Sequence, residues 1–293
     1  MQLNQYLSIK KKCRILLPDS CVLMGVVDPT GTLEENEIFI QIRKDSFSVH
    51  RHGYGAKKRE KRMEEAEAVS SIDSIHKVIE GDVLVTRNPC THPGDIRRLK
   101  CVDNPRLKEM FNVIIFSQKG ERPQCNMMSG GDLDGDVYFI TWDKELVSYV
   151  KPENIHPPAD YSKSQLIKEK PESDDIADYF CFYLERDVLG TVSNLWLTLC
   201  DYYGEKGPCN ENCLALSQMC SVAVDFAKHG ECVSRKNFSP LTKIVKSYPD
   251  FLEKEGKPMI QSQGVLGQLY RDIKNDFALD AMVENDRKMS ICL

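Results

Sequence analysis

The sequence lacks any long hydrophobic run. Its longest apolar stretches are short segments such as Asn112–Phe116 and Val137–Trp142, whereas a helix that spans a membrane needs about 20 apolar residues. The opening residues Met1-Gln2-Leu3-Asn4 also lack the charged-then-apolar layout of a signal peptide. We therefore expect no association with a membrane.

The sequence also lacks a surplus of positive charge. Its 39 Lys and Arg residues stand against 44 Asp and Glu residues, for a formal net charge of −5. This balance argues against a protein whose whole surface binds polyanions, although it leaves room for a local basic groove. At 293 residues, 41% of them hydrophobic, the chain is long enough for one large domain or two modest ones.

The 12 cysteines contain no Cys-x-x-Cys pair and are scattered along the chain. In a chain that can build a core, this favours reduced thiols in the cytoplasm or nucleus over a secreted disulfide framework. A zinc site of Cys209, Cys213, Cys220 and Cys232 with His229 is conceivable. Cys213 and Cys220 lie seven residues apart on one face of an expected helix, so buried core thiols are the favoured interpretation.

The first 150 residues read mostly as strands, and we interpret 1–150 as one domain. In Glu37–Ile42 three isoleucines alternate with Phe39 and Gln41, the period of a strand with one buried face. Further strands are predicted at Val22–Val27, Val83–Thr86, Val113–Phe116 and Val137–Thr141. Their irregular spacing and their Gly and Pro turns favour a barrel over a layered αβα fold.

A helical pattern interrupts these strands at Ala56–Ile79, where apolar residues recur every three or four positions. Its basic opening turn could touch nucleic acid, although a solvated face is favoured. After Lys151 the pattern becomes helical, and we interpret 151–293 as a mainly α-helical region. Helices are expected to begin near Ser173 or Asp174 and to cover about Glu211–His229 and Val265–Ala281.

The strongest chemical signal is the acidic triplet Asp132, Asp134 and Asp136, followed at once by an apolar strand. Three carboxylates at i, i+2 and i+4 repel one another unless a hard divalent cation lies among them. Oxygen-only ligands select Mg²⁺, Mn²⁺ or Ca²⁺ over Zn²⁺. The neighbouring glycines let the backbone turn tightly and leave space for a phosphate: Gly130, Gly131 and Gly135.

Other interpretations of the triplet fit less well. Counted from Asp132, an EF-hand would place Gly at Val137 and Glu at Asp143, and a strand follows here instead of a helix. In phosphatases of the haloacid dehalogenase kind the apolar strand precedes the acids and Thr follows the Gly, whereas Asp136 follows Gly135 here. An acidic surface turn is disfavoured by the glycines and the adjoining strand. Magnesium chemistry is the leading hypothesis.

The segment upstream supplies basic groups that suit a phosphate ligand. Arg87 ends a predicted strand, is fixed by Asn88-Pro89, and could hold a phosphate or a ribose hydroxyl. His92 lies in the same loop and could touch substrate or hydrogen-bond the loop backbone. Arg97 and Arg98 could meet a nucleic-acid backbone, and a surface ion pair is the alternative for each arginine.

Together, Val83–Arg98 and Gly130–Phe139 resemble the catalytic core of the eukaryotic RNA-dependent RNA polymerases of RNA silencing. Further matching stretches are Leu23–Asp28, Val222–Gly230 and Leu266–Arg271. A fainter likeness, an Arg-x-Pro loop leading to an Asp-x-Asp-Gly-Asp cluster, extends to the largest subunit of DNA-directed RNA polymerases.

The resemblance implies an α+β fold: a double-psi β-barrel catalytic domain, one of the two barrels of the family, with an inserted helix and a mainly helical C-terminal region. It implies that Asp132, Asp134 and Asp136 hold a catalytic Mg²⁺, with Mn²⁺ as an alternative. The implied reaction is nucleotidyl transfer with template RNA and ribonucleoside triphosphates, making double-stranded RNA for RNA silencing. The nucleotide- and RNA-binding residues expected on this basis are Arg87, His92, Arg97, Arg98, Gly130, Gly131 and Gly135.

Members of that family are much longer chains whose second barrel supplies basic residues facing the metal. We therefore expect the missing N-terminal barrel to come from the same longer chain or from a partner chain. The hypothesis is that the isolated 293 residues bind Mg²⁺ weakly and do not extend a primer. The alternative is a catalytically silent RNA-binding or decoy module of the same fold. A magnesium-dependent phosphohydrolase is weakened by the strand order.

Overall fold

The computed structural model of the chain describes residues 17–43, 76–161, 173–186, 188–226 and 232–274. The described residues belong to two compact units, one made of Pro18–Tyr161 and the other including the residues from Ser162 onward. In these described ranges, no helix is both long enough and apolar enough to cross a membrane.

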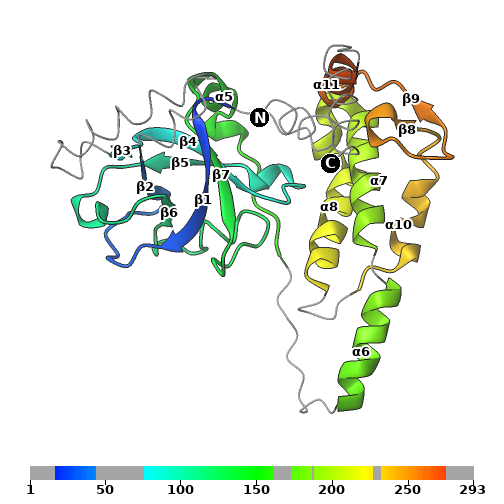
Figure 1. Ribbon diagram of the computed structural model, residues 1–293, viewed down its shortest axis with the longest axis horizontal. Coiled ribbons are helices and arrows are strands. Elements are labelled where there is room, and N and C mark those ends of the chain that lie inside the picture. Colours follow the sequence, from blue (N-terminus) through cyan, green and yellow to red (C-terminus); the bar gives the residue numbers. More distant parts are fainter. Residues whose placement is uncertain (1–16, 44–75, 162–172, 187, 227–231, 275–293) are drawn as a thin grey trace, which may run out of the picture. The chain divides into compact units, whose positions relative to one another are not determined.

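The first unit is a strand barrel (Figure 1, blue to green). The hydrogen-bonded order of the strands is β3-β2-β5-β4-β7-β1-β6, and β2 also pairs with β6, so six strands close on themselves while β3 extends from β2. Closure leaves these six strands without an open edge. The strands are β1 (Ser20–Val27), β2 (Glu37–Arg43), β3 (His76–Val78), β4 (Gly81–Arg87), β5 (Arg97–Cys101), β6 (Val113–Phe116) and β7 (Val137–Thr141).

Strand β2 shows why the barrel forms. Its isoleucines, Ile38, Ile40 and Ile42, belong to the main core, as their alternation predicts. The opposite face is also apolar, because Phe39 is fully buried in a second cluster around Ile115. A strand buried on both faces must lie between two packed layers. The predicted strands at β1, β2, β4, β6 and β7 are all confirmed.

Two segments of the barrel differ from the sequence-based prediction. The expected helix Ala56–Ile79 is wrong at its end, because His76–Val78 forms β3 and pairs with β2, with Val78 opposite Gln41. The rest of that prediction lies outside the described residues. Strand β5 was not predicted, because Arg97 and Arg98 were considered only as basic residues, yet it pairs with both β4 and β2. In each case pairing with neighbouring strands outweighs the local pattern.

The second unit consists mainly of helices: α6 (Ser173–Arg186), α7 (Leu189–Tyr203), α8 (Glu211–Val224), α10 (Arg235–Thr242) and α11 (Val265–Lys274). It also contains a short parallel pair, β8 (Tyr248–Pro249) and β9 (Met259–Ile260). The predicted starts of the helices at Glu211 and Val265 are confirmed. Residues 227–231 and 275–293, which include the predicted ends, lie outside the described residues.

The core of the second unit lies between α7 and α8. Val192, Leu195 and Leu199 from α7 pack with Leu216 from α8. Cys213 and Cys220 are buried in the same cluster, which agrees with the prediction of core thiols. His229, the other residue type of the conceivable zinc site, lies outside the described residues.

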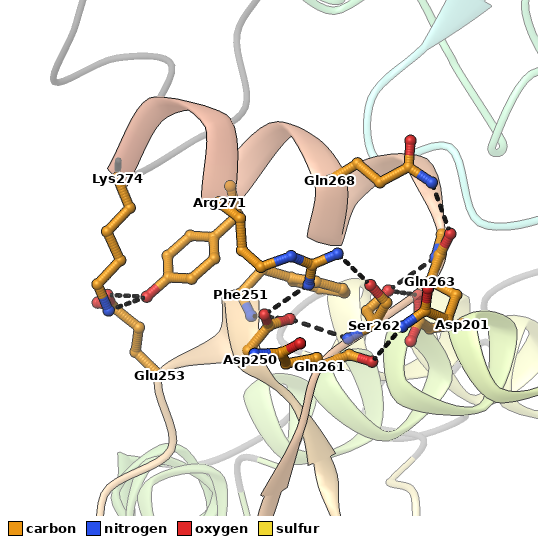
Figure 2. Close-up of polar contacts among 12 residues, drawn as sticks. Asp201, Asp250, Phe251, Glu253, Gln261, Ser262, Gln263, Gln268, Arg271 and Lys274 are labelled. Carbon is orange, nitrogen blue, oxygen red and sulfur yellow. Dashed lines mark hydrogen bonds and ion pairs between the residues drawn. The ribbon is translucent and has the colours of Figure 1, made fainter. Parts of the chain in front are cut away.

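A polar cluster fastens α11 to this unit, and we call Asp201, Asp250, Ser262 and Arg271 the α11 cluster (Figure 2). Arg271 donates from Nη1 to Asp250 Oδ2 at 2.7 Å and from Nη2 to the Ser262 carbonyl at 2.7 Å. The Ser262 hydroxyl donates to Asp201 Oδ1 on α7 at 2.6 Å. Four segments separated in sequence are thereby joined: α7, the turn after β8, the residues after β9 and α11.

Candidate metal centre

The acid loop, residues 129–136, leads directly into β7. One carboxylate oxygen each from Asp132, Asp134 and Asp136 lies within 4.8 Å of the other two. Among the described residues, no second group of three or more His, Cys, Asp or Glu side chains converges in this way. The structure therefore brings together the three acids that the sequence singled out.

The backbone of the acid loop explains how acids at alternating positions converge. In an extended strand, side chains at positions i, i+2 and i+4 share one face but are spaced by about 6.6 Å per step. Here φ is positive at Ser129 (52°), Gly130 (68°), Leu133 (62°) and Gly135 (126°), so the chain curls repeatedly. The curl also lets Asp136 Oδ2 accept a hydrogen bond from the Asp132 N–H at 3.0 Å. The loop is thus closed on its own last residue.

Arg87, at the end of β4, joins the acid loop through two contacts. Its Nε lies 2.7 Å from Asp136 Oδ1, and its Nη1 donates to the Ser129 carbonyl at 2.9 Å. The Asp136 side chain is only 7% exposed, whereas Asp132 and Asp134 are exposed. The guanidinium therefore compensates the one buried acid, while the two exposed acids are accessible to a ligand.

The donor set fits a hard divalent cation. The three carboxylates carry −3, Arg87 contributes +1, and a divalent ion would bring the group to neutrality. All of the converging donors are oxygens, the ligands preferred by Mg²⁺ and Mn²⁺. On this observation the residues present suit the ion that the sequence predicts.

The three glycines of the acid loop have different reasons to be glycine. A Cβ at Gly131 would lie 2.5 Å from the Tyr138 hydroxyl and 2.8 Å from the Cys125 carbonyl, so the backbone approaches the core closely there. Gly135 has open space around it, but its φ of 126° strains any side chain. Gly130 combines a positive φ with a Cβ position 3.3 Å from the ring of Tyr161.

His92 stabilises the loop that follows Arg87 through a hydrogen bond to its backbone. Its Nδ1 accepts a hydrogen bond from the Gly94 N–H at 3.0 Å, and so caps the short 3-10 turn Pro93–Asp95. Burial lowers the pKa of His92 below its usual value, against the opposing effect of the Asp95 carboxylate. A neutral ring is the form that can accept this bond. Of the two uses expected for His92, the hydrogen bond to the loop backbone is therefore present.

Arg97 and Arg98 form their contacts away from the acid loop. Arg98 forms an ion pair with Asp82 at 2.6 Å, toward the far end of β4 from Arg87, and also donates to the Val150 carbonyl. Arg97 donates to the His156 carbonyl at 3.4 Å, and its pKa is lowered by burial and by the nearby charge of Arg122. Of the predicted basic residues, only Arg87 contacts the acid loop in the hydrogen bonds and ion pairs of the described residues.

Tyr138 belongs to the barrel core. It is fully buried, and its ring meets Phe116 edge-on with centroids 4.9 Å apart. Burial raises the pKa of its hydroxyl well above the usual range. Its role is packing beneath the acid loop, and not stacking on a base.

Sequence reasoning missed the residues that hold the acid loop in place, chiefly Asp95, Ser129 and Tyr161. Asp95 is 1% exposed and accepts hydrogen bonds from all three segments around it. One local signal was present: His92 and Asp95 have the spacing of a capping box, with reciprocal side-chain to backbone bonds. The partners from distant segments had no sequence signal.

Comparison with known proteins identifies the family to which the chain belongs. A family model described as RNA dependent RNA polymerase matches residues 1–273. The probable RNA-dependent RNA polymerase 2 of Oryza sativa is 38% identical over 272 residues, which is 92% of this chain and 22% of the relative. RNA-dependent RNA polymerase 6 of Arabidopsis thaliana is 35% identical over 291 residues, 98% of this chain and 23% of the relative. RNA-dependent RNA polymerase 1 of Schizosaccharomyces pombe is 34% identical over 278 residues, 90% of this chain and 21% of the relative.

A solved structure agrees on the fold. The RNA dependent RNA polymerase QDE-1 from Thielavia terrestris matches with a TM-score of 0.65 and 22% sequence identity, over 97% of this chain and 31% of that one. This likeness and the closed barrel confirm the predicted α+β class with a double-psi β-barrel. The chain spans less than a quarter of the length of each of the three relatives named above.

Proposed function

Because this chain belongs to the RNA-dependent RNA polymerase family, we propose that it is the catalytic portion of such a polymerase. In this proposal it takes part in joining ribonucleotides on an RNA template, so that double-stranded RNA is made for RNA silencing. The observation that carries the proposal is the convergence of Asp132, Asp134 and Asp136 within 4.8 Å, with Arg87 paired to the buried acid. Family membership supplies the reaction, and the acid loop supplies a place for it.

The proposed reaction is a nucleotidyl transfer. The 3′-hydroxyl oxygen of the growing RNA forms a bond to the α-phosphorus of a ribonucleoside triphosphate, and the bond from that phosphorus to the bridging oxygen breaks. Pyrophosphate leaves, and the proton of the hydroxyl passes to solvent. A Mg²⁺ ion held by the three acids, or Mn²⁺ in its place, would lower the pKa of the hydroxyl and offset charge on the phosphate.

Different residues of the chain have different roles in the proposed reaction. Asp132 and Asp134 are exposed and offer ligand oxygens, while Asp136 is buried and anchors the loop. Arg87 uses Nε and Nη1 for the loop, so the remaining N–H groups of its planar guanidinium can donate to a phosphate or a ribose hydroxyl. Gly131 and Gly135 keep the loop close to the barrel and free of side-chain bulk.

The basic residues away from the acid loop take supporting roles in this proposal. Arg97 is paired with no carboxylate among the described residues, and it lies near the charge of Arg122, an arrangement suited to a phosphate of the RNA backbone. Arg98 is already engaged by Asp82 and braces the β4–β5 hairpin. His92 shapes the loop between the two arginine positions.

The chain spans less than a quarter of the relatives named above, so we propose that its partner barrel lies in the same longer chain or in another chain. That barrel would supply basic groups facing the metal. On this account the 293 residues alone bind the metal ion and do not extend a primer.

The test measures metal binding and nucleotide incorporation by the 293-residue chain. We expect saturable Mn²⁺ binding by electron paramagnetic resonance, and we expect Asp134→Asn to lose it, because Asp134 is an exposed member of the triad. The matched control is Asp103→Asn, which removes a carboxylate paired with Lys108 elsewhere on the barrel. Template-dependent incorporation of labelled ribonucleotides is expected only after the partner barrel is supplied.

Three outcomes would contradict parts of this proposal. Equal Mn²⁺ binding by the wild type and Asp134→Asn would exclude the acid loop as the metal centre. Robust incorporation by the isolated chain would exclude the need for a second barrel. Incorporation that survives Asp134→Asn in the assembled polymerase would exclude a catalytic role for the triad, and would leave an RNA-binding or decoy module.

A further inference from the structure

Asp95 joins three segments of the barrel through one buried carboxylate. It lies in the 3-10 turn Pro93–Asp95 and is 1% exposed. Its Oδ2 accepts the His92 N–H at 3.0 Å, and its Oδ1 accepts the Ser129 N–H at 3.0 Å. The hydroxyl of Tyr161 donates to the same Oδ1. Residues 34 and 66 positions away in the sequence therefore meet at this side chain.

Ser129, the first residue of the acid loop, is held by all of its polar groups. Its N–H is taken by Asp95, its hydroxyl donates to the Pro89 carbonyl at 2.6 Å, and its own carbonyl accepts from Arg87 Nη1 at 2.9 Å. Ser129 also has a φ of 52°, in the left-handed region that a non-glycine residue rarely adopts. Such a conformation persists only where the surroundings over-determine it. Here the surroundings are the segment 87–95.

A third segment, residues 156–161, packs across this junction. The Tyr161 ring lies against Gly130, where a Cβ would be 3.3 Å away. Arg122 donates to the Ala159 carbonyl at 2.8 Å, and its guanidinium carbon lies 5.8 Å from the centre of the Tyr161 ring. Burial and the neighbouring Asp95 carboxylate raise the pKa of the Tyr161 hydroxyl, which therefore remains protonated and able to donate.

We propose that Asp95 is a positioning residue, which sets where the acid loop begins relative to Arg87. Through the Ser129 N–H it fixes the residue whose carbonyl binds Arg87, and Arg87 in turn holds Asp136 at 2.7 Å. Asp95 is linked to the acid loop through the Ser129 N–H, so its effect on the three acids passes through Ser129 and Arg87. The consequence for metal binding rests on the proposed function, whereas the consequence for the acid loop does not.

The first measurement is hydrogen–deuterium exchange of the full 293-residue chain. Asp95→Asn keeps the size of the side chain but removes the negative charge, which weakens the hydrogen bond from the Ser129 N–H, and leaves one acceptor oxygen where the carboxylate had two for the His92 and Ser129 N–H groups. We expect the peptide covering the acid loop to exchange roughly tenfold faster, as loss of a hydrogen bond to a buried carboxylate implies. Peptides covering β2 and β6 are expected to keep the wild-type rate, which a merely destabilised barrel would not do.

The second measurement is Mn²⁺ affinity by electron paramagnetic resonance. Loss of a residue that orients a metal site typically lowers affinity roughly tenfold or more, and we expect this for Asp95→Asn. The matched control is Asp82→Asn, which also removes a carboxylate charge, but at an exposed position of the β4–β5 hairpin, where the carboxylate pairs with Arg98. Its acid-loop exchange and Mn²⁺ affinity are expected to equal those of the wild type.

Each outcome decides one part of the inference. Unchanged acid-loop exchange in folded Asp95→Asn would overturn the positioning role. Faster exchange with a wild-type chain that binds no Mn²⁺ would keep the positioning role and overturn the metal centre of the proposed function. If Asp95→Asn does not fold, Tyr161→Phe replaces it, because it deletes one donor to Asp95 and retains the ring against Gly130. Faster acid-loop exchange is expected there too, and an unchanged rate would overturn the proposal.

Discussion

The two units of the protein contain arginine–carboxylate pairs of nearly the same geometry. In the barrel, Arg87 and Asp136 are 2.7 Å apart, and in the helical unit Arg271 and Asp250 are 2.7 Å apart. Each arginine also donates to a backbone carbonyl, and each carboxylate also accepts a backbone N–H. All four side chains are largely buried, with exposed fractions from 7% to 24%.

The difference lies in the charge around each pair. Beside Asp136 the acid loop places Asp132 and Asp134, both exposed, so two further carboxylates converge on the barrel pair. In the α11 cluster the one further carboxylate, Asp201, accepts the Ser262 hydroxyl at 2.6 Å and ties α7 to the segment after β9 (Figure 2). The same pairing motif therefore stabilises a fold in one unit, and in the other it lies beside two exposed carboxylates that we propose as metal ligands.

The largest effect is expected from breaking each pair in turn with Arg87→Met and Arg271→Met. Either change leaves a buried carboxylate without its arginine partner. We expect it to lower the free energy of unfolding of its unit by about 2–3 kcal/mol, somewhat less than the loss on breaking a fully buried pair. Addition of MgCl₂ is expected to restore stability in Arg87→Met, because the cation replaces the guanidinium charge. Urea unfolding with and without MgCl₂ measures both effects.

Arg271→Met is the matched control in this experiment, since its pair has no further exposed acid beside it. Its loss of stability is expected to be the same with and without MgCl₂. If the salt restored both variants equally, or neither, the barrel pair would not differ from the α11 cluster in the way its charges indicate.

A smaller effect is expected from adding one methyl group to each unit, with Gly131→Ala and Gly267→Ala. A Cβ at Gly131 meets the Tyr138 hydroxyl at 2.5 Å, and one at Gly267 meets Ser262 Cβ at 2.5 Å. Overpacking of this kind costs about 1–3 kcal/mol, and we expect the lower part of that range. Thermal unfolding measures the stability, and Mn²⁺ titration is expected to be impaired in Gly131→Ala alone.

Gly135→Ala tests the effect of backbone strain alone in the acid loop, whereas Gly131→Ala tests the effect of steric overlap. Its surroundings are open and only its φ of 126° opposes a side chain. A loss of Mn²⁺ affinity in Gly267→Ala would contradict the assignment of α11 to a purely structural role.

The smallest effect is the pH dependence that His92 gives to the barrel. The pKa of His92 is lowered by burial, so the unfolded chain binds the proton more readily than the folded one. Its contribution to stability is therefore complete above the unfolded pKa of about 6.5 and is lost as the pH falls below it. His92→Asn keeps an N-cap acceptor and is expected to flatten this slope, as measured by urea unfolding from pH 5 to pH 8. An unchanged slope would show that His92 is not its source.

The elements that sequence reasoning predicted are those whose signal is local. The alternation in Glu37–Arg43 marks β2, and the triplet Asp132, Asp134 and Asp136 lies within five residues, so side-chain type and spacing suffice. Strand β5 was missed because three of its five residues are basic and only two positions, Leu99 and Cys101, are buried. So short an alternation is a weak signal. Its identity as a strand depends on the backbones of β4 and β2, which no local pattern records.

The sequence by itself indicated a barrel and supplied the acidic triplet that predicts a site for a hard cation, because these follow from periodicity and from the chemistry of neighbouring residues. Only the tertiary structure decided which arginine meets the acids, and that Tyr161 reaches Asp95 while Asp95 reaches Ser129 at the start of the acid loop. Those contacts join residues 34 to 66 positions apart. Such contacts exist only once the barrel has closed, because its strands carry the loops to the same place.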